Sequence, residues 1–277
     1  TKPVISAGVL TSCTLINNGG GQHSTFDNIE CNGENRTSLC GFTLSVGCVA
    51  LRCHVRQCTN NAYNSSAGLL RCSATECSTQ PAFAGAFFLF CESYANSVTG
   101  FDINTPGAVT NCISRNNTGG SSHGFNLGNG FNITTCNCTA YSNGGNGFNM
   151  VQNNSGLTNC ISTNNSGWGF SQSSNALRLI NCAGFSNTSG NVTAGAGTMY
   201  NLSFVTLTAD PFVNAASGNL ALNNTAGGGA AVRAVAFPAT FPAGLTAHYL
   251  DIGAVQHQDS GGGGIMTGRN WTGGYNG

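Results

Sequence analysis

The side chains that could perform acid–base chemistry are few and scattered along this chain. Its 277 residues include nine Asp or Glu, nine Lys or Arg and five His. Acid–base catalysis needs such groups to converge within a few ångströms, yet the only lysine is Lys2 and no two aspartates occupy the same place in neighbouring repeats. The carboxylates are Asp27, Glu30, Glu34, Glu76, Glu92, Asp102, Asp210, Asp251 and Asp259. The pattern predicts no catalytic residues and no cofactor.

The densest charged group consists of Glu30, Arg52 and Arg71, each one position before a cysteine, with His54 and Glu76 nearby. One interpretation is a clamp for an acidic sugar. The other is a row of ion pairs on an outer face, which contributes little stability. We favour the second.

Metal binding is the next chemistry to consider. His23, His54, His123, His248 and His257 have no zinc-ligand spacing with the cysteines. The segments "CHVRQC" and "CSATEC" place Cys53 with Cys58, and Cys72 with Cys77, in two adjacent repeats. Cys58 and Cys77 have three interpretations: part of a zinc site, a disulfide, or an extension of an interior stack. We favour the last two, so no metal ligand is assigned.

The spacing of the fourteen cysteines carries a stronger pattern. Nine of them recur 18 to 24 residues apart: Cys13, Cys31, Cys53, Cys72, Cys91, Cys112, Cys136, Cys160 and Cys182. A repeat of this length is typical of solenoids. Leucine-rich repeats would need more leucine, and helical repeats less Gly and Asn. Short β-rich runs between Asn, Gly and Ser clusters indicate strands and turns, and we expect the ladder cysteines to be mostly free thiols in the interior.

Two further rows repeat with the cysteines. The phrases "GFTL", "GFDI", "GFNL", "GFNM" and "GFSQ" predict an aromatic ladder of Phe42, Phe101, Phe125, Phe148 and Phe170. Asn117, Asn165 and Asn187 stand five positions after a cysteine, with Asn96 in the preceding repeat. Because residues at equal positions of stacked parallel strands lie above one another, we expect these amides to form a second ladder.

These features resemble the right-handed parallel β-helix of the pectin-lyase-like group over residues 10–205. The segments Asp210-Pro211-Phe212 and Asp251-Ile252-Gly253-Ala254 are similar to the ends of bacterial and phage surface β-helix proteins. The resemblance implies an all-β fold: a single right-handed parallel β-helix of about nine to eleven coils. We divide the chain into β-helix repeats at 1–205, C-terminal coils and a closing segment at 206–258, and a Gly-rich tail at 259–277 that is flexible or docks on a neighbouring subunit.

Composition excludes several partners. Only 6% of the residues are charged and the formal net charge is zero, so nucleic acid is not an expected partner. No apolar run is long enough for a membrane span. We expect an extracellular protein: secreted, at a cell surface or on a virion. The opening "TKPVISAGVL" resembles no signal peptide, so we expect a removed leader or a start inside a longer repeat array.

Glycosylation sequons are numerous, as a chain rich in Asn, Ser and Thr produces by chance. The candidate acceptors are Asn35, Asn64, Asn116, Asn132, Asn137, Asn153, Asn164, Asn187, Asn191, Asn201, Asn223 and Asn270.

Three functions remain. The favoured one is a non-catalytic structural protein, a subunit of an extracellular fibre, surface layer or virion appendage that assembles with itself. A solenoid end without a cap exposes strand edges, which favours head-to-tail homopolymers. The alternatives are a polysaccharide-binding or pectate-lyase-like protein and a phage tail spike, so glycans are the other candidate partners.

Overall fold

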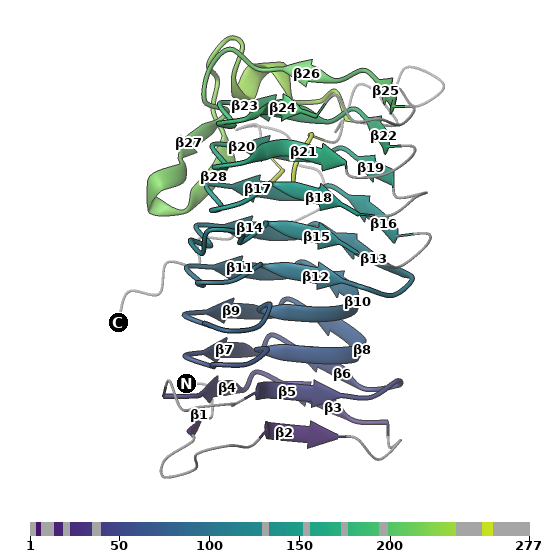
Figure 1. The fold of residues 1–277 in the computed structure, drawn as a ribbon, viewed down its shortest axis with the longest axis vertical. Coiled ribbons are helices and arrows are strands. Elements are labelled where there is room, and N and C mark those ends of the chain that lie inside the picture. The colour runs from purple at the N-terminus through teal and green to yellow at the C-terminus, as the bar shows by residue number, and fades with distance from the viewer. Residues whose placement is uncertain are drawn as a thin grey trace, which may run out of the picture.

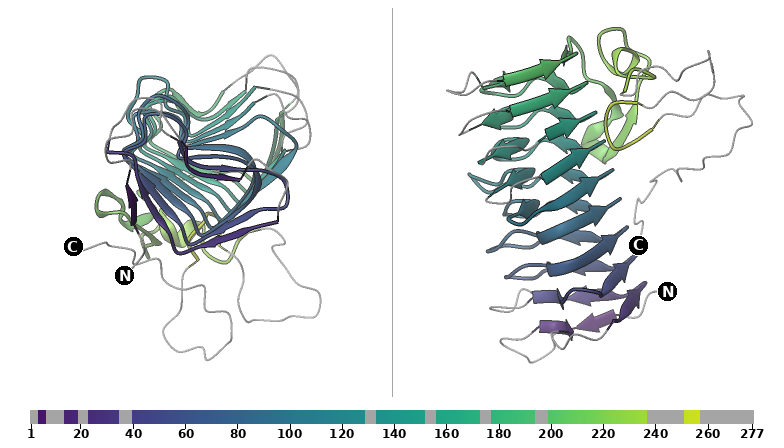
Figure 2. Two further views of the ribbon diagram at one scale, coloured as in Figure 1. Left: turned by 90° about the horizontal axis from the view of Figure 1, so that it is seen from below. Right: turned by 90° about the vertical axis from the view of Figure 1, so that its right-hand side faces the viewer.

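A computed structural model describes residues 4–6, 14–18, 23–34, 40–128, 133–151, 156–172, 177–193, 199–236 and 251–256. In these residues the chain winds into a stack of parallel coils with three outer faces, here called A, B and C (Figure 1; Figure 2, left). The all-β parallel solenoid expected from the repeats is thereby confirmed. Among the described residues, helical structure is limited to two short 3₁₀ turns, η1 (Ala215–Ser217) and η2 (Gly229–Ala231).

Face A is a ten-stranded sheet. Its strands, in spatial order, are β1 (Val4–Ser6), β4 (Glu30–Asn32), β7 (His54–Arg56), β9 (Ser73–Thr75), β11 (Glu92–Tyr94), β14 (Ile113–Arg115), β17 (Thr139–Tyr141), β20 (Ile161–Thr163), β23 (Ala183–Phe185) and β26 (Val205–Thr206).

Faces B and C share one sixteen-stranded sheet, because β8 (Tyr63–Leu70) and β10 (Phe83–Leu89) run through both faces. The other strands of face B are β2 (Thr14–Asn18), β5 (Cys40–Leu44), β12 (Phe101–Ile103), β15 (Phe125–Leu127), β18 (Phe148–Met150), β21 (Trp168–Gln172) and β24 (Gly190–Val192). The other strands of face C are β3 (Thr25–Asp27), β6 (Val49–Leu51), β13 (Gly107–Thr110), β16 (Ile133–Cys136), β19 (Gly156–Thr158), β22 (Leu177–Ile180) and β25 (Met199–Leu202).

The solenoid has about seven turns, so the nine to eleven coils expected from the cysteine spacing is more than the structure shows. Some coils are described only in part, including those that carry β1 and β25. The division of the chain at residues 205 and 258 stays a prediction, and the tail at 259–277 lies outside the described residues.

Sharp corners on both sides of face A keep its strands to two or three residues. From β4 to β26, the corner before each strand contains a residue in the left-handed backbone conformation, such as Arg71 (φ 55°) or Asn111 (φ 52°). From β7 to β23, the residue after each strand is also left-handed, such as Gln57 (φ 56°) or Asn116 (φ 53°). Asn adopts this conformation more readily than most residues, so the Asn-rich turns of the repeat suit it.

A column of cysteines follows the first corner into the interior. Backbone pairing places in one column Ile29, Cys53, Cys72, Cys91, Cys112, Cys138, Cys160, Cys182 and Phe204. The seven cysteines are buried free thiols. Each Sγ donates to the carbonyl two residues earlier, at 3.3 to 3.6 Å. These bonds satisfy the thiols inside a narrow apolar core.

The cysteine ladder predicted from the sequence was wrong by two residues at two places. Cys138, not Cys136, belongs to the interior column, and Cys136 pairs instead with Thr110 and Thr158 on face C, where it is half-buried. Cys31 pairs with Val55, two positions beyond the column. Cys13 lies outside the described residues.

An aromatic column lies beneath face B. Phe42, Tyr63, Phe83, Phe101, Phe125, Phe148 and Phe170 stack ring on ring, with centroids 4.6 to 5.3 Å apart and planes within 13° of parallel. All five phenylalanines of the expected ladder are in it. Tyr63 and Phe83 were missed because their repeats lack the Gly-Phe phrase.

The amide ladder follows the second corner. Its members are the buried residues Asn96, Asn117, Asn143, Asn165 and Asn187, and each Nδ2 donates to the Oδ1 of the next at 2.9 to 3.0 Å. From Asn117 onwards, each side-chain Oδ1 also accepts a hydrogen bond from the backbone N–H of the preceding asparagine in the ladder. The ladder expected from the sequence therefore exists, with Asn143 as an added member.

Residues 207–236 and 251–256 lie along the outside of face A (Figure 1; Figure 2). The segment includes β27 (Phe212–Asn214), antiparallel to β28 (Asn219–Leu222). Phe212, Leu220, Val232 and Ile252 are buried with Ile113 and Ile161, two residues on the outer side of face A. The segment thus covers the half of face A whose outer residues are apolar.

Candidate functional site

The charged residues expected to form one row are divided among separate contacts. Arg52 forms an ion pair with Asp27. Glu30 lies beside His54 in the strand register, and its side chain accepts a 2.8 Å hydrogen bond from Arg56 Nε. The guanidinium of Arg71 lies 5.8 Å from the Phe90 ring centroid. Glu30 lies outside the row because, like Cys31, it is two positions beyond the place that the cysteine spacing predicts: it pairs with His54 and not with Arg52. These contacts agree with ion pairing on the outer surface.

The buried cysteines Cys58 and Cys77 occupy the two positions of the amide-ladder column that precede Asn96. The backbone N–H of Cys77 donates to Asn96 Oδ1 at 2.8 Å, and its Sγ is a free thiol that donates to the Thr75 carbonyl. The two cysteines therefore extend an interior stack. In the part of the chain that the structure describes, no group of three or more His, Cys, Asp or Glu is placed to hold a metal ion.

The candidate glycosylation sites differ in exposure. Asn64 is exposed, whereas Asn116, Asn137, Asn164, Asn191 and Asn223 are half-buried. Asn187 is 7% exposed and belongs to the amide ladder, so it is not an accessible acceptor in the folded protein. Asn35, Asn132, Asn153 and Asn270, and the side chain of Asn201, lie outside the described residues.

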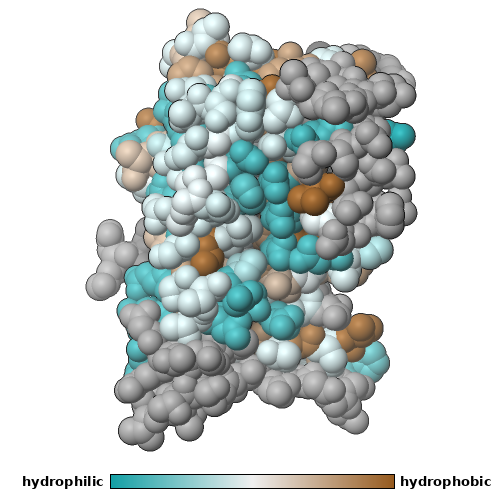
Figure 3. Space-filling view, viewed as in Figure 1, coloured by the Kyte–Doolittle hydropathy of each residue, from teal (hydrophilic) through white to brown (hydrophobic). Residues whose placement is uncertain are grey.

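Face B carries a second network of amides on its outer surface. Asp102, Asn126 and Asn149 are the central residues of β12, β15 and β18 and pair in register. Asn126 Nδ2 donates to Asp102 Oδ1 at 2.7 Å, and Asn149 Nδ2 donates to Asn126 Oδ1 at 2.8 Å. All three side chains are half-buried, and hydrophilic residues gather over these strands in Figure 3.

A parallel column lies at the edge of face B next to this row. Its members are His123, Asn146 and Trp168, on three successive coils. His123 Nδ1 accepts the backbone N–H of Asn146 at 3.0 Å, and Asn146 Oδ1 accepts that of Trp168 at 2.9 Å. Asn146 Nδ2 donates to Asn149 Oδ1 at 3.1 Å and joins the two columns. We call Asp102, His123, Asn126, Asn146, Asn149 and Trp168 the amide face.

The hydrogen bonds fix the state of His123. Because Nδ1 accepts a bond, the proton of the neutral ring is on Nε2. Burial lowers the pKa of His123, against a smaller opposing effect of the Asp102 carboxylate. The imidazole is therefore neutral at physiological pH and contributes one N–H donor to the amide face.

The amide face is suited to binding hydroxyl groups. An Asn side chain has two N–H donors and two acceptor lone pairs. Within the network, Asn126 uses one N–H on Asp102 and one lone pair on Asn149, so its amide is oriented and still has capacity for a ligand. The half-buried ring of Trp168, which lies over Gly190, offers an apolar surface at one end. In the sequence, Asp102 stands as an isolated carboxylate. The polar residue after each repeated Gly-Phe was the signal for the row.

Strand pairing alone defines this protein as a parallel β-solenoid. No protein-family model matches the chain, and no curated protein matches it significantly. Among solved structures, the chain is similar to the Azotobacter vinelandii mannuronan C-5 epimerase AlgE4 A-module, with a TM-score of 0.33 and 11% identity, over 69% of this chain and 74% of that one. At that score the similarity carries no argument about function.

Proposed function

We propose that this protein is an extracellular, non-catalytic β-solenoid that binds a polysaccharide along the amide face. The observation that supports this is the continuous network from Asp102 to Trp168 over neighbouring coils. Adjacent strands are about 4.8 Å apart, so the face offers donors and acceptors at a regular interval. A glycan chain presents its hydroxyl groups at regular intervals as well. Several contacts that are each weak then add up to a higher overall affinity for the chain.

The same face supports binding over hydrolysis. Glycoside hydrolysis uses two carboxyl groups on opposite sides of the scissile bond. Asp102 is the only carboxylate in the described strands of face B, and both of its oxygens already accept amide bonds, from Asn126 and Asn104. Each carboxylate oxygen has a second lone pair, so Asp102 can still accept hydrogen bonds from the hydroxyl groups of a ligand.

Affinity electrophoresis against neutral and acidic polysaccharides tests this proposal. Asn126→Ala with Asn149→Ala should weaken binding about tenfold or more, because each loss removes a hydrogen-bonding group at about 1 kcal/mol, and Trp168→Ala should weaken it further. Asn219→Ala, at an exposed amide of the C-terminal segment, is the control and should bind normally. Absence of binding to every polymer would refute the proposal, and release of unsaturated or reducing products would refute its non-catalytic part.

A second candidate function is that of a structural subunit that associates with copies of itself. It is favoured by a different observation, the exposed apolar residues Val49, Phe87 and Leu89 on face C. Apolar side chains that gather on one face commonly mark a protein interface.

A further inference from the structure

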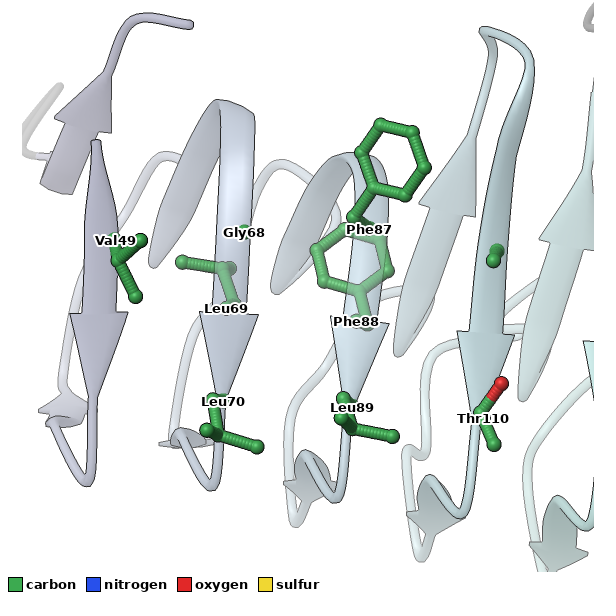
Figure 4. Close-up of a pocket in the computed structure, with 9 residues that line it drawn as sticks. Val49, Gly68, Leu69, Leu70, Phe87, Phe88, Leu89 and Thr110 are labelled. Atoms are coloured by element: carbon green, nitrogen blue, oxygen red, sulfur yellow. The ribbon is translucent and has the colours of Figure 1, made fainter. Parts of the chain in front are cut away.

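Face C carries an apolar strip in which large and small side chains alternate. Val49, Gly68, Phe87 and Ala108 pair in register on four successive strands. Val49 is 37% exposed and Phe87 is 52% exposed. Figure 4 shows Gly68 between the side chains of Val49 and Phe87 on adjacent strands. The strip therefore presents a knob at Phe87 beside a gap at Gly68.

The gap is large enough for an aromatic ring. It opens into a cavity of about 330 Å³ whose lining includes Val49, Leu70, Phe87 and Leu89. A protein cavity of about 150 Å³ can hold benzene. Among the described residues other than its chain neighbours, no atom lies within 4 Å of the position that a Cβ on Gly68 would take. The gap over Gly68 therefore has room for a side chain.

The chain path keeps this part of face C open. β8 and β10 pass from face B to face C as continuous strands, so no connection separates the two faces on the coils that carry Gly68 and Phe87. On the next coils a connection separates the two faces, as between β12 and β13. The strip lies where a second flat surface could approach.

We propose that this strip pairs with the same strip of a second copy, around a two-fold axis parallel to the strands that passes between Gly68 and Phe87. Such an axis reverses the order of the coils. Phe87 of each copy then fills the gap over the other copy's Gly68, and Val49 faces Ala108. In both pairs a large side chain meets a small one, as an isologous interface requires. A copy of this chain is therefore the partner that the strip fits.

The neighbouring columns agree with the same axis. Leu51, Leu70, Leu89 and Thr110 form the second column, so Leu70 would face Leu89 and Leu51 would face Thr110. At the corner beyond them, exposed Arg71 would face the ring of Phe90 in the other copy. A guanidinium is attracted to the electron-rich face of an aromatic ring, and Arg71 already lies 5.8 Å from Phe90 of its own chain. Shape and charge are thus both complementary.

Sedimentation of the full chain over a range of concentrations, with reductant present, tests the proposal. Wild type should form a dimer. Phe87→Ala should raise the dimer dissociation constant on the order of 30-fold, as loss of a central aromatic contact does. Gly68→Val should weaken the dimer to a similar degree by filling the gap, although its own fold has room for the side chain. Val213→Ala removes an equally exposed apolar residue elsewhere and should change nothing.

The decisive variant exchanges knob and gap. Gly68→Phe combined with Phe87→Ala places each ring opposite the other copy's alanine and should restore the dimer. A nonspecific apolar association would show no such rescue. A monomer at every concentration, a dimer that none of these substitutions weakens, or assembly that continues into filaments would each overturn the proposal. Glycan binding by the amide face is independent of all these outcomes.

Discussion

Burial governs the chemistry of the interior thiols. Cys112 and Cys160 are enclosed between coils, and loss of solvent raises the pKa of both, with hydrogen bonds from neighbouring thiols adding to the effect. Burial also raises the pKa of Cys77 to about 12 and that of Cys31 to about 12. A thiol that stays protonated is a poor nucleophile, so these four cysteines are suited to packing in the interior.

The raised pKa values predict that the free energy of unfolding decreases in alkaline solution. Unfolded thiols ionise near pH ~8.5, whereas folded Cys31, Cys77, Cys112 and Cys160 stay protonated well above that pH. Each of these four thiols therefore costs about 1.4 kcal/mol per pH unit between its unfolded and its folded pKa. Urea unfolding at pH 7, 8, 9 and 10 should show constant stability up to about pH 8 and a steep loss above it.

Cys77→Ala provides the matched comparison for this pH dependence. It removes one buried thiol and should lessen the alkaline slope by that thiol's share. A free energy of unfolding that is level from pH 8 to pH 10 would contradict the burial of Cys31, Cys77, Cys112 and Cys160.

Backbone conformation explains why cysteine spacing alone misplaced two residues. In "TTCNC", Cys136 and Cys138 both suit a repeat of about 22 residues. The residue before each column cysteine is left-handed, and Asn137 (φ 51°) adopts that conformation. The β-branched Thr135 would resist it. Asn28 (φ 57°) likewise precedes Ile29, which places Cys31 beyond the column. The preference of Asn for left-handed corners could have corrected both positions.

At the scale of the strands, the ladders were predictable wherever a phrase repeats. The Gly-Phe phrase predicts five of the seven stacked rings. Once Cys138 replaces Cys136 in the cysteine column, Asn143 stands five positions after its cysteine and joins the amide ladder. The amide face was not predictable, because the sequence shows only that a polar residue follows each Phe. Which amides bond to which depends on the strand register of β12, β15 and β18.

The two amide rows should respond differently to substitution. Buried Asn143 donates to Asn165 Oδ1 and to the Ser114 carbonyl, and accepts from Asn117. Asn143→Ala removes these bonds and also takes away the Oδ1 that accepts the backbone N–H of buried Asn117, so we expect a loss of about 2–4 kcal/mol. Asn126→Ala removes a surface amide and should cost under ~1 kcal/mol. Urea unfolding of both variants measures the difference, and equal losses would contradict the separation of an interior ladder from a binding face.

At the scale of the whole molecule, the outer residues of face A change character along the stack. Glu30, His54, Ser73 and Glu92 occupy this column from β4 to β11, and Ile113, Thr139, Ile161 and Ala183 follow in it from β14 to β23. The change predicts a cover over the later coils, which residues 207–236 and 251–256 provide. The motifs Asp210-Pro211-Phe212 and Asp251-Ile252-Gly253-Ala254 stabilise the backbone of this cover. Asp210 Oδ1 accepts the Phe212 N–H, and buried Asp251 accepts the Ala234 N–H.

The cover should open without unwinding the solenoid. Ile252 is 1% exposed, and its neighbours Gly253 and Ala254 donate from their backbone N–H groups to the Asn159 carbonyl and to Thr139 Oγ1. Ile252→Ala should lower the free energy of opening of this segment by about 2–4 kcal/mol, the usual loss of stability when a buried Ile becomes Ala. Hydrogen exchange should then quicken at Gly253 and Ala254 and in residues 212–222, while β12, β15 and β18 keep their protection. Val213→Ala, exposed on the same segment, should leave exchange unchanged. If exchange quickened equally in face B, the cover and the coils would be one cooperative unit and this division of the molecule would be wrong.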